Sequence, residues 1–324
     1  MRHRWMLLLI VLALVVGAGM GGFLIGGRSR GGTSPAQETP QRVVIAIQPT
    51  MSAAEMLEKA RPLEQFLEQQ LGGKVDVQIY VPTSYAAVVE SLRFGQAQVA
   101  FMSAWPSYLA TQMAGAEVAL AEVREVVIGQ EKREAPFYYS YWVVRADSPY
   151  ENLLSLKGKR ACFPSPISTS GYVAPMGRLV ELGYLTVEAG READPKAFFG
   201  DVLFGGGYAQ CWQALQQGQV DVTIIAGDVS ERLYREVLAN TRVLEQQGPI
   251  PSHAVVVSKD LAEPLRSQVL QAIEGLGAPE YRPLMRSFIS SIFVRFQSTT
   301  AQEHLATLQR YLRLAGLKFT ERLG

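Results

Sequence analysis

PSPISTSGYVAP, running from Pro164 to Pro175, is the stretch of the sequence that indicates the fold most clearly. It joins a short apolar strand pattern at Lys159–Phe163 to a helical pattern at Gly171–Leu182. A strand, a polar turn and a helix in this order form the repeating unit of α/β proteins. The same unit recurs on both sides of this stretch, so the sequence predicts an α/β fold.

Outward from this stretch, strand patterns and helical patterns alternate along the chain. Further strands are predicted at Val43–Ile47, Val75–Tyr80, Gln98–Met102, Val118–Val127, Phe137–Val144, Val202–Phe204, Val220–Ile225 and Ala254–Val257. Further helices are predicted at Ala53–Gln70, Ser84–Phe94, Pro106–Met113, Tyr208–Gln217, Leu261–Leu276 and Thr299–Ala315. Strands that alternate with helices of about 10–15 residues are typical of βαβ units, and they predict mainly parallel sheets.

The restart of the pattern near the middle of the chain predicts two lobes. Residues 43–145 are expected to form lobe 1 and residues 146–250 lobe 2, whereas residues 251–324 return to lobe 1 and supply the C-terminal helices. Ligands of open α/β sheets bind at the carboxyl ends of the strands. We therefore expect a ligand cleft between the lobes, with hinges near residues 143–152 and 245–252.

Residues 1–30 have the layout of an export segment. Residues 5–27 carry no charge, and Arg2 and Arg4 precede them. An apolar helix of this length can span a bilayer, and a basic start before an apolar run is also typical of a signal peptide. A cleaved signal peptide and a signal anchor both remain open, and residues 31–42 form a polar linker. In both cases we expect the remainder of the chain to lie outside the cytoplasm, in the periplasm or at the outer face of the membrane. If the N-terminal segment is not cleaved, residues 5–27 would contact the membrane.

Composition and motifs exclude several classes of protein. The 324 residues are 48% hydrophobic and carry a formal net charge of +1. The apolar fraction excludes a largely disordered chain, and the balanced charge argues against a nucleic-acid partner, which requires clustered excess base. The sequence has only three histidines and lacks HExxH, GxSxG and P-loop motifs. We therefore expect no enzyme, no catalytic residues, no cofactor and no resident metal.

The polar part of the deciding stretch suits an oxyanion. Ser168, Thr169 and Ser170 supply three hydroxyls at the predicted start of a helix, and Gly171 lets the backbone approach a ligand closely. The first N–H groups of a helix lack internal partners and lie at the positive end of its dipole. Serine and threonine are also the preferred helix caps, so a purely structural role is the alternative.

Several stretches, in order along the chain, resemble the phosphate, phosphite and phosphonate-binding proteins of ABC transporters. The quoted stretches are Thr83–Phe94 (TSYAAVVESLRF), Gln98–Phe101 (QVAF) with Ser107-Tyr108, Leu156–Gly171 (LKGKRACFPSPISTSG), Gly218–Val222 (GQVDV) and, more weakly, Ile250–Leu261 (IPSHAVVVSKDL). The resemblance implies the two-lobed type 2 periplasmic-binding-protein fold. It also implies a small oxyanion ligand and a membrane permease as partner.

The resemblance assigns ligand-binding roles to seven residues. Tyr85 matches the tyrosine that reaches the ligand from lobe 1, and the family's oxyanion-binding loop corresponds to Ser168, Thr169 and Ser170. The remaining three positions are Tyr208, Asp228 and His253.

Two of these positions depart from the family pattern. Tyr208 stands where many relatives have histidine, and His253 stands where relatives commonly have aspartate. Asp228 falls near an acidic position that can contact an amino group on the ligand's tail. Losing one of two acceptors for an ammonium group disfavours 2-aminoethylphosphonate and favours a smaller oxyanion or a neutral or acidic tail. Each residue also has a structural alternative, as a surface tyrosine, a helix cap or a surface histidine.

The chain has two cysteines, Cys162 and Cys211, both in the predicted lobe 2. Outside the cytoplasm such a pair is usually a disulfide, although two buried thiols or a thiol ligand site completed by His253 remain open. The sequence as a whole predicts an extracytoplasmic solute-binding protein that captures phosphonate, phosphite or phosphate for an ABC importer. The alternatives are a sensor component for a histidine kinase, a thiol-dependent arsenite or metal binder, and an enzyme of the same fold.

Overall fold

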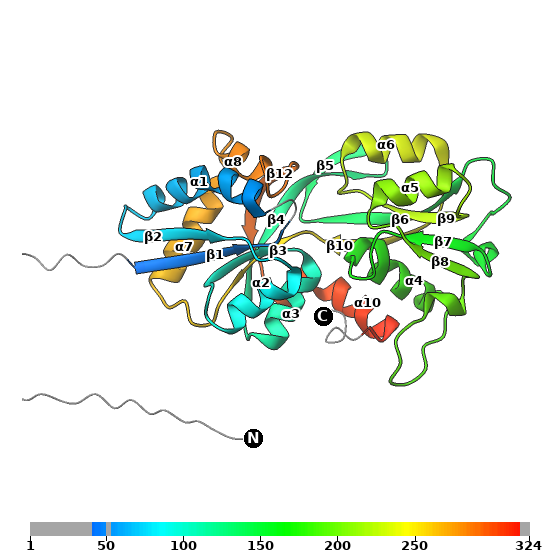
Figure 1. The fold of residues 1–324 in the computed structure, drawn as a ribbon, viewed down its shortest axis with the longest axis horizontal. Helices are drawn as coiled ribbons and strands as arrows, with labels where there is room; N and C mark the ends of the chain where they lie inside the picture. Colours follow the sequence, from blue (N-terminus) through cyan, green and yellow to red (C-terminus); the bar gives the residue numbers. More distant parts are fainter. Residues whose placement is uncertain (1–40, 50–52, 318–324) are drawn as a thin grey trace, which may run out of the picture. The chain divides into compact units, whose positions relative to one another are not determined.

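The computed structural model describes residues 41–49 and 53–317. The apolar segment at 5–27 and most of the predicted linker lie outside the described residues. Among the residues described, no helix combines the length and apolar character needed to cross a bilayer. Two β-sheets with helices on their faces make up the described part (Figure 1).

The first sheet has seven strands in the order β12-β4-β11-β3-β1-β2, with β5 paired to β4. Its strands are β1 (Gln41–Ile47), β2 (Val75–Tyr80), β3 (Val99–Met102), β4 (Glu117–Ile128), β5 (Glu131–Ala135), β11 (Ala254–Val257) and β12 (Phe293–Ser298). Its helices are α1 (Ala53–Gln70), α2 (Tyr85–Arg93), α3 (Ala104–Met113), α7 (Leu265–Glu274) and α8 (Arg282–Arg286).

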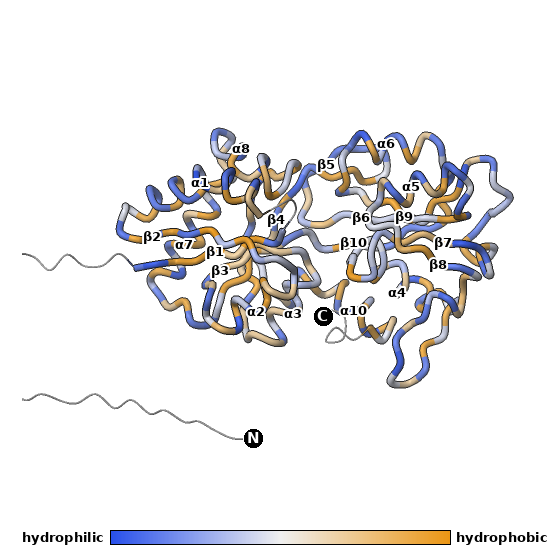
Figure 2. Tube along the Cα trace, viewed as in Figure 1, coloured by the Kyte–Doolittle hydropathy of each residue, from blue (hydrophilic) through white to orange (hydrophobic). Residues whose placement is uncertain are grey.

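Side chains of β1 alternate between two cores, which explains why both faces of this sheet carry helices. Val43, Ile45 and Ile47 pack in one core with residues of α1, α7 and α8. Ala46 packs in the other core with residues of α2 and α3. Figure 1 shows α1 and α8 above the sheet and α2 and α3 below it. Successive strand residues point to opposite faces, so a strand covered on both sides is apolar along its covered length, as the hydropathy colours of β1 show after its exposed hydrophilic start (Figure 2).

The second sheet has five strands in the order β10-β6-β9-β7-β8. Its strands are β6 (Phe137–Arg145), β7 (Arg160–Phe163), β8 (Asp201–Phe204), β9 (Val222–Ala226) and β10 (Thr241–Pro251). Its helices are α4 (Ala174–Glu181), α5 (Tyr208–Gln216), α6 (Glu231–Asn240) and α10 (Ala306–Ala315), with the short α9 (Ala301–His304) preceding α10. Helices α5 and α6 cover one face, whereas α4 and α10 cover the other (Figure 1).

Both sheets are mixed, so the prediction of mainly parallel sheets is wrong. Only the pairs β1–β2, β1–β3, β7–β8 and β7–β9 are parallel among the described strands. The other pairs, which involve β4, β5, β6, β10, β11 and β12, are antiparallel. The antiparallel strands include three that sequence patterns did not predict: β5 (EKREA), β10 and β12. Strand β5 is almost entirely charged because it pairs only with β4, so its sequence has no apolar alternation.

The chain passes between the sheets at different positions from those expected. Strand β6 pairs with β9 and β10, so the second sheet begins at Phe137 and not after residue 145. The predicted hinge at 143–152 therefore lies within the second sheet and its following loop. The passages fall instead at Pro136, between β5 and β6, and at 252–253, between β10 and β11. Beyond 253, β11 and β12 do return to the first sheet, whereas α10 packs against α4.

The backbone of Gly227, in the loop after β9, connects strand β4 of the first sheet with strand β6 of the second. Its N–H donates to the Tyr139 carbonyl at 2.8 Å, and its carbonyl accepts from Val127 N at 3.1 Å. A Cβ at this position would lie 2.5 Å from the Val127 carbonyl oxygen. Gly227→Ala is therefore expected to lower the free energy of unfolding by about 1–3 kcal/mol, because backbone must move.

Urea unfolding of the two purified proteins measures this difference. Gly275→Ala is the matched control, because a Cβ there would meet Phe66 at an ordinary 3.6 Å. Equal losses of stability in the two variants would contradict the crowding argument.

Candidate functional site

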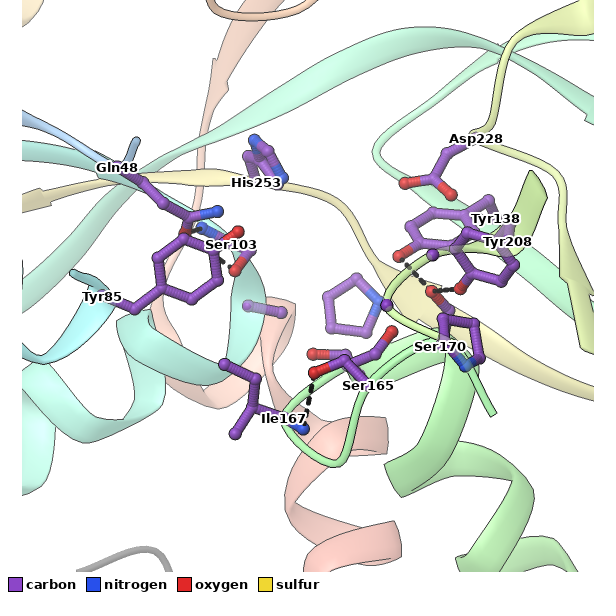
Figure 3. A pocket seen from close by; sticks show the side chains of 17 residues that line it. Gln48, Tyr85, Ser103, Tyr138, Ser165, Ile167, Ser170, Tyr208, Asp228 and His253 are labelled. Atoms are coloured by element: carbon purple, nitrogen blue, oxygen red, sulfur yellow. Dashed lines mark hydrogen bonds between the residues drawn. The ribbon is translucent and has the colours of Figure 1, made fainter. Parts of the chain in front are cut away.

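All seven residues predicted to bind a ligand line one pocket of about 430 Å³ (Figure 3). Their places on the chain span both sheets: Tyr85 belongs to the first-sheet half, and the Ser168–Ser170 loop, Tyr208 and Asp228 belong to the second. His253 lies in the passage between β10 and β11. The seven predicted residues are separated by up to 168 positions, from Tyr85 to His253, and the pocket brings them together.

On the first-sheet side, the pocket wall is formed by residues that follow strands β1 and β3. Gln48 Oε1 accepts hydrogen bonds from Ser103 N at 2.8 Å and Ser103 Oγ at 2.9 Å. Tyr85 is the first residue of α2, whose N-terminus is capped by Ser84 through Ala87 N at 3.2 Å. Burial raises the pKa of Tyr85, against the opposing effect of a hydrogen bond with Gln48, so its hydroxyl stays protonated.

The Ser168–Ser170 loop is anchored at both ends by aromatic residues. Phe163, at the end of β7, packs against Trp142 with ring centroids 5.8 Å apart, and against Tyr172 at 5.3 Å. Ser168 caps the helical turn that follows, because its Oγ accepts from Gly171 N at 2.9 Å. A Cβ on Gly171 would lie 2.7 Å from Pro164 Cγ and 2.8 Å from Ser168 Oγ, so only glycine allows this tight loop.

Three hydroxyls form a chain on the second-sheet side of the pocket (Figure 3). Tyr138 Oη donates to Ser170 Oγ at 3.1 Å, and Ser170 Oγ lies 2.7 Å from Tyr208 Oη. Burial raises the pKa of Tyr138 and of Tyr208, and the nearby Asp228 carboxylate adds to both shifts. All three groups are therefore neutral. Because Tyr138 donates to Ser170, either Ser170 or Tyr208 keeps one proton that it can donate to a ligand.

A buried group of charges lies behind this wall. Arg124 of β4 pairs with Glu122 through Nε–Oε1 at 3.0 Å and Nη2–Oε2 at 3.1 Å. Its Nη1 also donates to Asp228 Oδ2 at 3.1 Å, which links the first-sheet half to the loop after β9. The side chains of Glu122 and Arg124 are 2% and 5% exposed, whereas Asp228 is 17% exposed and lines the pocket. Burial raises the pKa of Asp228, with Arg124 acting in the opposite direction.

Two histidines flank the passage at 252–253. His253 Nδ1 lies 3.6 Å from Glu122 Oε2, and His304 Nε2 lies 3.1 Å from the Ser252 carbonyl oxygen. Burial lowers the pKa of His253 well below its ordinary value, and the charge of Arg124 adds to this effect. Burial also lowers the pKa of His304, although its contact with the Ser252 carbonyl works in the opposite direction. Both rings are therefore neutral near pH 7.

Cys162 and Cys211 form a disulfide, with Cα atoms 5.5 Å apart. It joins β7, which leads into the Ser168–Ser170 loop, to α5, which begins at Tyr208. Gly205 packs on the bond, because a Cβ there would lie 2.8 Å and 3.1 Å from the two sulfur atoms. The pair of cysteines thus ties together the two segments that carry Ser170 and Tyr208. Within residues 41–49 and 53–317, no cluster of three or more histidine, cysteine or acidic side chains is arranged for a metal ion.

A family model described as "ABC transporter, phosphonate, periplasmic substrate-binding protein" matches residues 45–304. The chain belongs to this family. The match covers both sheets and every residue of the pocket, and a periplasmic family is by description extracytoplasmic. The resemblance that the sequence carries is therefore confirmed.

Three relatives illustrate the similarity. The chain is 32% identical over 193 residues to the phosphate-import protein of Mycolicibacterium smegmatis, a match that covers 58% of this chain and 56% of that protein. It is 25% identical over 258 residues to the phosphonates-binding periplasmic protein of Escherichia coli, covering 77% and 71%. A binding protein component of an ABC phosphonate transporter from Pseudomonas aeruginosa shares the fold, with a TM-score of 0.61, 21% identity, and 85% and 87% coverage. The curated relatives are thus transport proteins and not enzymes.

The sequence alone did not identify five residues of this site. They are Gln48, Ser103, Glu122, Arg124 and Tyr138. Gln48 and Ser103 directly follow strands β1 and β3, so the rule that ligands bind at the carboxyl ends of strands would have found them. Glu122 and Arg124 alternate with apolar residues in a predicted strand, and nothing in the sequence reveals that Asp228 lies opposite.

The two neutral histidines predict a pH dependence of stability. Their pKa values in the unfolded chain are near 6.5, and folding lowers both. Below that pH the unfolded state therefore binds protons that the folded state does not, so stability falls as the pH decreases. The loss is at most about 1.4 kcal/mol per pH unit for each histidine.

Urea unfolding at pH 7.5, 6.5 and 5.5 tests this expectation. His253→Gln should show a shallower decline than the wild-type protein between pH 6.5 and 5.5. Parallel curves for the two proteins would show that folding does not lower the pKa of His253.

Removing the disulfide is predicted to lower the stability of the protein. Cross-linking residues 49 positions apart contributes about 4 kcal/mol through the entropy of the unfolded chain. We therefore expect Cys162→Ala/Cys211→Ala to melt about 10 °C lower than wild type, by differential scanning calorimetry. Reductant should lower the melting temperature of wild type but leave that of the variant unchanged. A response of the variant to reductant would mean that the wild-type shift has another origin.

Proposed function

We propose that this protein is an extracytoplasmic solute-binding protein that captures a small phosphorus oxyanion, a phosphonate, phosphite or phosphate, for an ABC importer. The observation that carries the proposal is the pocket itself. Neutral donors from the Ser168–Ser170 loop and Tyr208 converge on one side, and Tyr85 lies on the other. Names of the curated relatives point to the same ligand class.

The donors of this pocket suit an oxyanion that must later be released. The hydroxyls of Ser168 and Thr169 and the remaining proton of the Ser170–Tyr208 pair can each donate to one oxyanion. The first backbone N–H groups of the turn at Thr169–Val173 add donors without adding a charge. Hydrogen bonds to a charged group contribute about 1.5–3 kcal/mol each, so three or four suffice for tight but reversible binding.

Closure of the two halves around the ligand would complete the site. Tyr85 and the residues after β1 and β3 belong to the first-sheet half, so they would contact a ligand already held by the Ser168–Ser170 loop. The passages at Pro136 and at 252–253 are the positions that would absorb the rotation. A membrane permease would then receive the ligand from the closed form.

The pocket does not favour a ligand with an ammonium tail. Asp228, the carboxylate that lines it, is already paired with Arg124, and the neighbouring His253 is neutral. A thiol-dependent arsenite site lacks its ligands, because the only two cysteines of the chain are joined in the disulfide.

The test is isothermal titration calorimetry of the purified full-length protein with phosphate, phosphite, methylphosphonate, 2-aminoethylphosphonate and sulfate. At least one phosphorus oxyanion should bind with a Kd in the micromolar range or below. Failure of all four phosphorus ligands to bind would refute the proposal.

Ser170→Ala is predicted to weaken that binding about 10- to 100-fold, because one hydrogen bond to the anion and the link between Tyr138 and Tyr208 are lost. Ser267→Ala is the matched control, since Ser267 is exposed on α7 of the first-sheet half. Unchanged Kd in Ser170→Ala would place the oxyanion elsewhere.

A further inference from the structure

Gln48, directly after β1, is a buried residue whose side-chain amide is fixed in one orientation. It is 6% exposed and lines the pocket. The backbone N–H of Ser103 can only donate, and it lies 2.8 Å from Gln48 Oε1, so the amide oxygen must face Ser103. The Ser103 hydroxyl donates to the same oxygen at 2.9 Å. The NH₂ end of the amide therefore points away from Ser103 and toward the interior of the pocket (Figure 3).

This NH₂ group retains a hydrogen for a ligand. An amide nitrogen can donate two hydrogen bonds. A hydrogen bond joins Gln48 to Tyr85, and because the amide oxygen is occupied by Ser103, Gln48 donates and Tyr85 accepts. The amide of Gln48 makes no further hydrogen bond to residues 41–49 and 53–317, which leaves its second N–H for a ligand. The hydroxyl proton of Tyr85 is available to a ligand as well.

The first-sheet side of the pocket is rich in donors and carries no charge. It consists of Gln48, Tyr85, Ser103 and Ala104, which we call the donor wall. Ala104 begins α3, and the Ser103 side chain does not cap this helix because its hydroxyl donates to Gln48. The first N–H groups of a helix have no acceptor within the helix. The donor wall therefore suits an acceptor atom of a ligand.

The pocket has room for a ligand that reaches both of its sides. Figure 3 shows Gln48 and Tyr85 across the pocket from Ser170. The pocket volume is about 430 Å³. At about 30 Å³ for each heavy atom, which is the share of one molecule in liquid water, the five heavy atoms of a phosphorus oxyanion fill about 150 Å³. A tail of a few atoms can therefore extend from the Ser168–Ser170 loop to the donor wall.

The charges of the pocket determine which tail fits the donor wall. An ammonium group can only donate, so it finds no acceptor in the NH₂ group of Gln48. A carboxylate would accept, but it would add a negative charge to a pocket whose described lining contains Asp228 and neither lysine nor arginine. Like charges in a poorly hydrated site repel strongly. A hydroxyl or carbonyl oxygen accepts a hydrogen bond without adding a charge, so it fits best.

We propose that the donor wall binds an uncharged acceptor oxygen at the end of the ligand's tail, and that Gln48 selects this oxygen. This assignment rests on the proposed function and names its substrate class, which is alkylphosphonates whose tail ends in a hydroxyl or carbonyl oxygen. The phosphonate group lies at the Ser168–Ser170 loop, and the terminal oxygen accepts hydrogen bonds from Gln48 Nε2 and Tyr85 Oη.

Titration calorimetry of the full-length protein tests the proposal with three phosphonates of equal size that differ in their terminal group. They are 2-hydroxyethylphosphonate, propylphosphonate and 2-aminoethylphosphonate, which end in a hydroxyl, a methyl and an ammonium group. The hydroxyl ligand should bind about 10- to 100-fold more tightly than the other two, because only its terminal atom accepts from the buried amide. Equal Kd values for the hydroxyl and methyl ligands would overturn the proposal.

Gln48→Glu supplies the second arm. The carboxylate keeps an acceptor for Ser103 N–H and replaces the NH₂ group by a second acceptor oxygen. The ratio of the Kd values for the hydroxyl and ammonium ligands is the measured quantity, since repulsion between the new carboxylate and the phosphonate affects both ligands alike. This preference should reverse in Gln48→Glu. Gln112→Glu, exposed on α3 of the same half, is the matched control and should keep the wild-type ratio.

Failure of this assignment differs from failure of the proposed function. An equal loss of affinity for the hydroxyl and ammonium ligands in Gln48→Glu would place Gln48 beside the phosphorus oxygens and overturn the assignment alone. Binding of phosphate or phosphite but of none of the three tailed phosphonates would do the same. Absence of binding by every phosphorus ligand would overturn both. The wild-type comparison needs no variant, so it decides the question even if Gln48→Glu does not fold.

Discussion

One buried guanidinium, that of Arg124, holds together the charged groups at the base of the pocket. It contacts Glu122 on its own strand and Asp228 on the loop after β9, so a single side chain joins the two halves of the molecule. Removing ions from water costs several kcal/mol each, and only a satisfied arrangement offsets that cost. Asp228 both pairs with Arg124 and lines the pocket, so the position of its carboxylate in the pocket depends on this buried ion pair.

The strand ends explain why distant residues meet. Gln48 and Ser103 follow β1 and β3, and the Ser168–Ser170 loop follows β7, while Asp228 follows β9. Parallel strands of one sheet have their carboxyl ends at the same edge, so the loops after them gather there. The disulfide between β7 and α5 and the close packing at Gly171 then fix the loop relative to Tyr208. The backbone thus supplies the convergence, and these local contacts supply the precise spacing of the hydroxyls.

The features that could be predicted from the sequence are those determined by residues close together along the chain. The run PSPISTSG contains turn residues and a helix cap, so the loop could be predicted from it, and the family pattern indicated Tyr85, Tyr208, Asp228 and His253. The mixed sheets could not be predicted in this way, because β5 (EKREA) and β10 carry little apolar alternation. Arg124 could not be predicted either, since its role depends on Asp228, 104 positions away and on the other sheet.

The hydrogen-bond donors of this pocket influence how strongly the proposed ligand would be held and how readily it would be released. A lysine or arginine in the lining would strengthen the hold on any anion, sulfate and phosphate alike, and would slow release to a permease. Hydroxyls and backbone N–H groups bind through direction and not through net charge, so each bond contributes only a modest free energy and can be broken singly. The lining of this pocket, among the described residues, thus offers directional donors without a lysine or arginine, which suits the reversible capture that we propose.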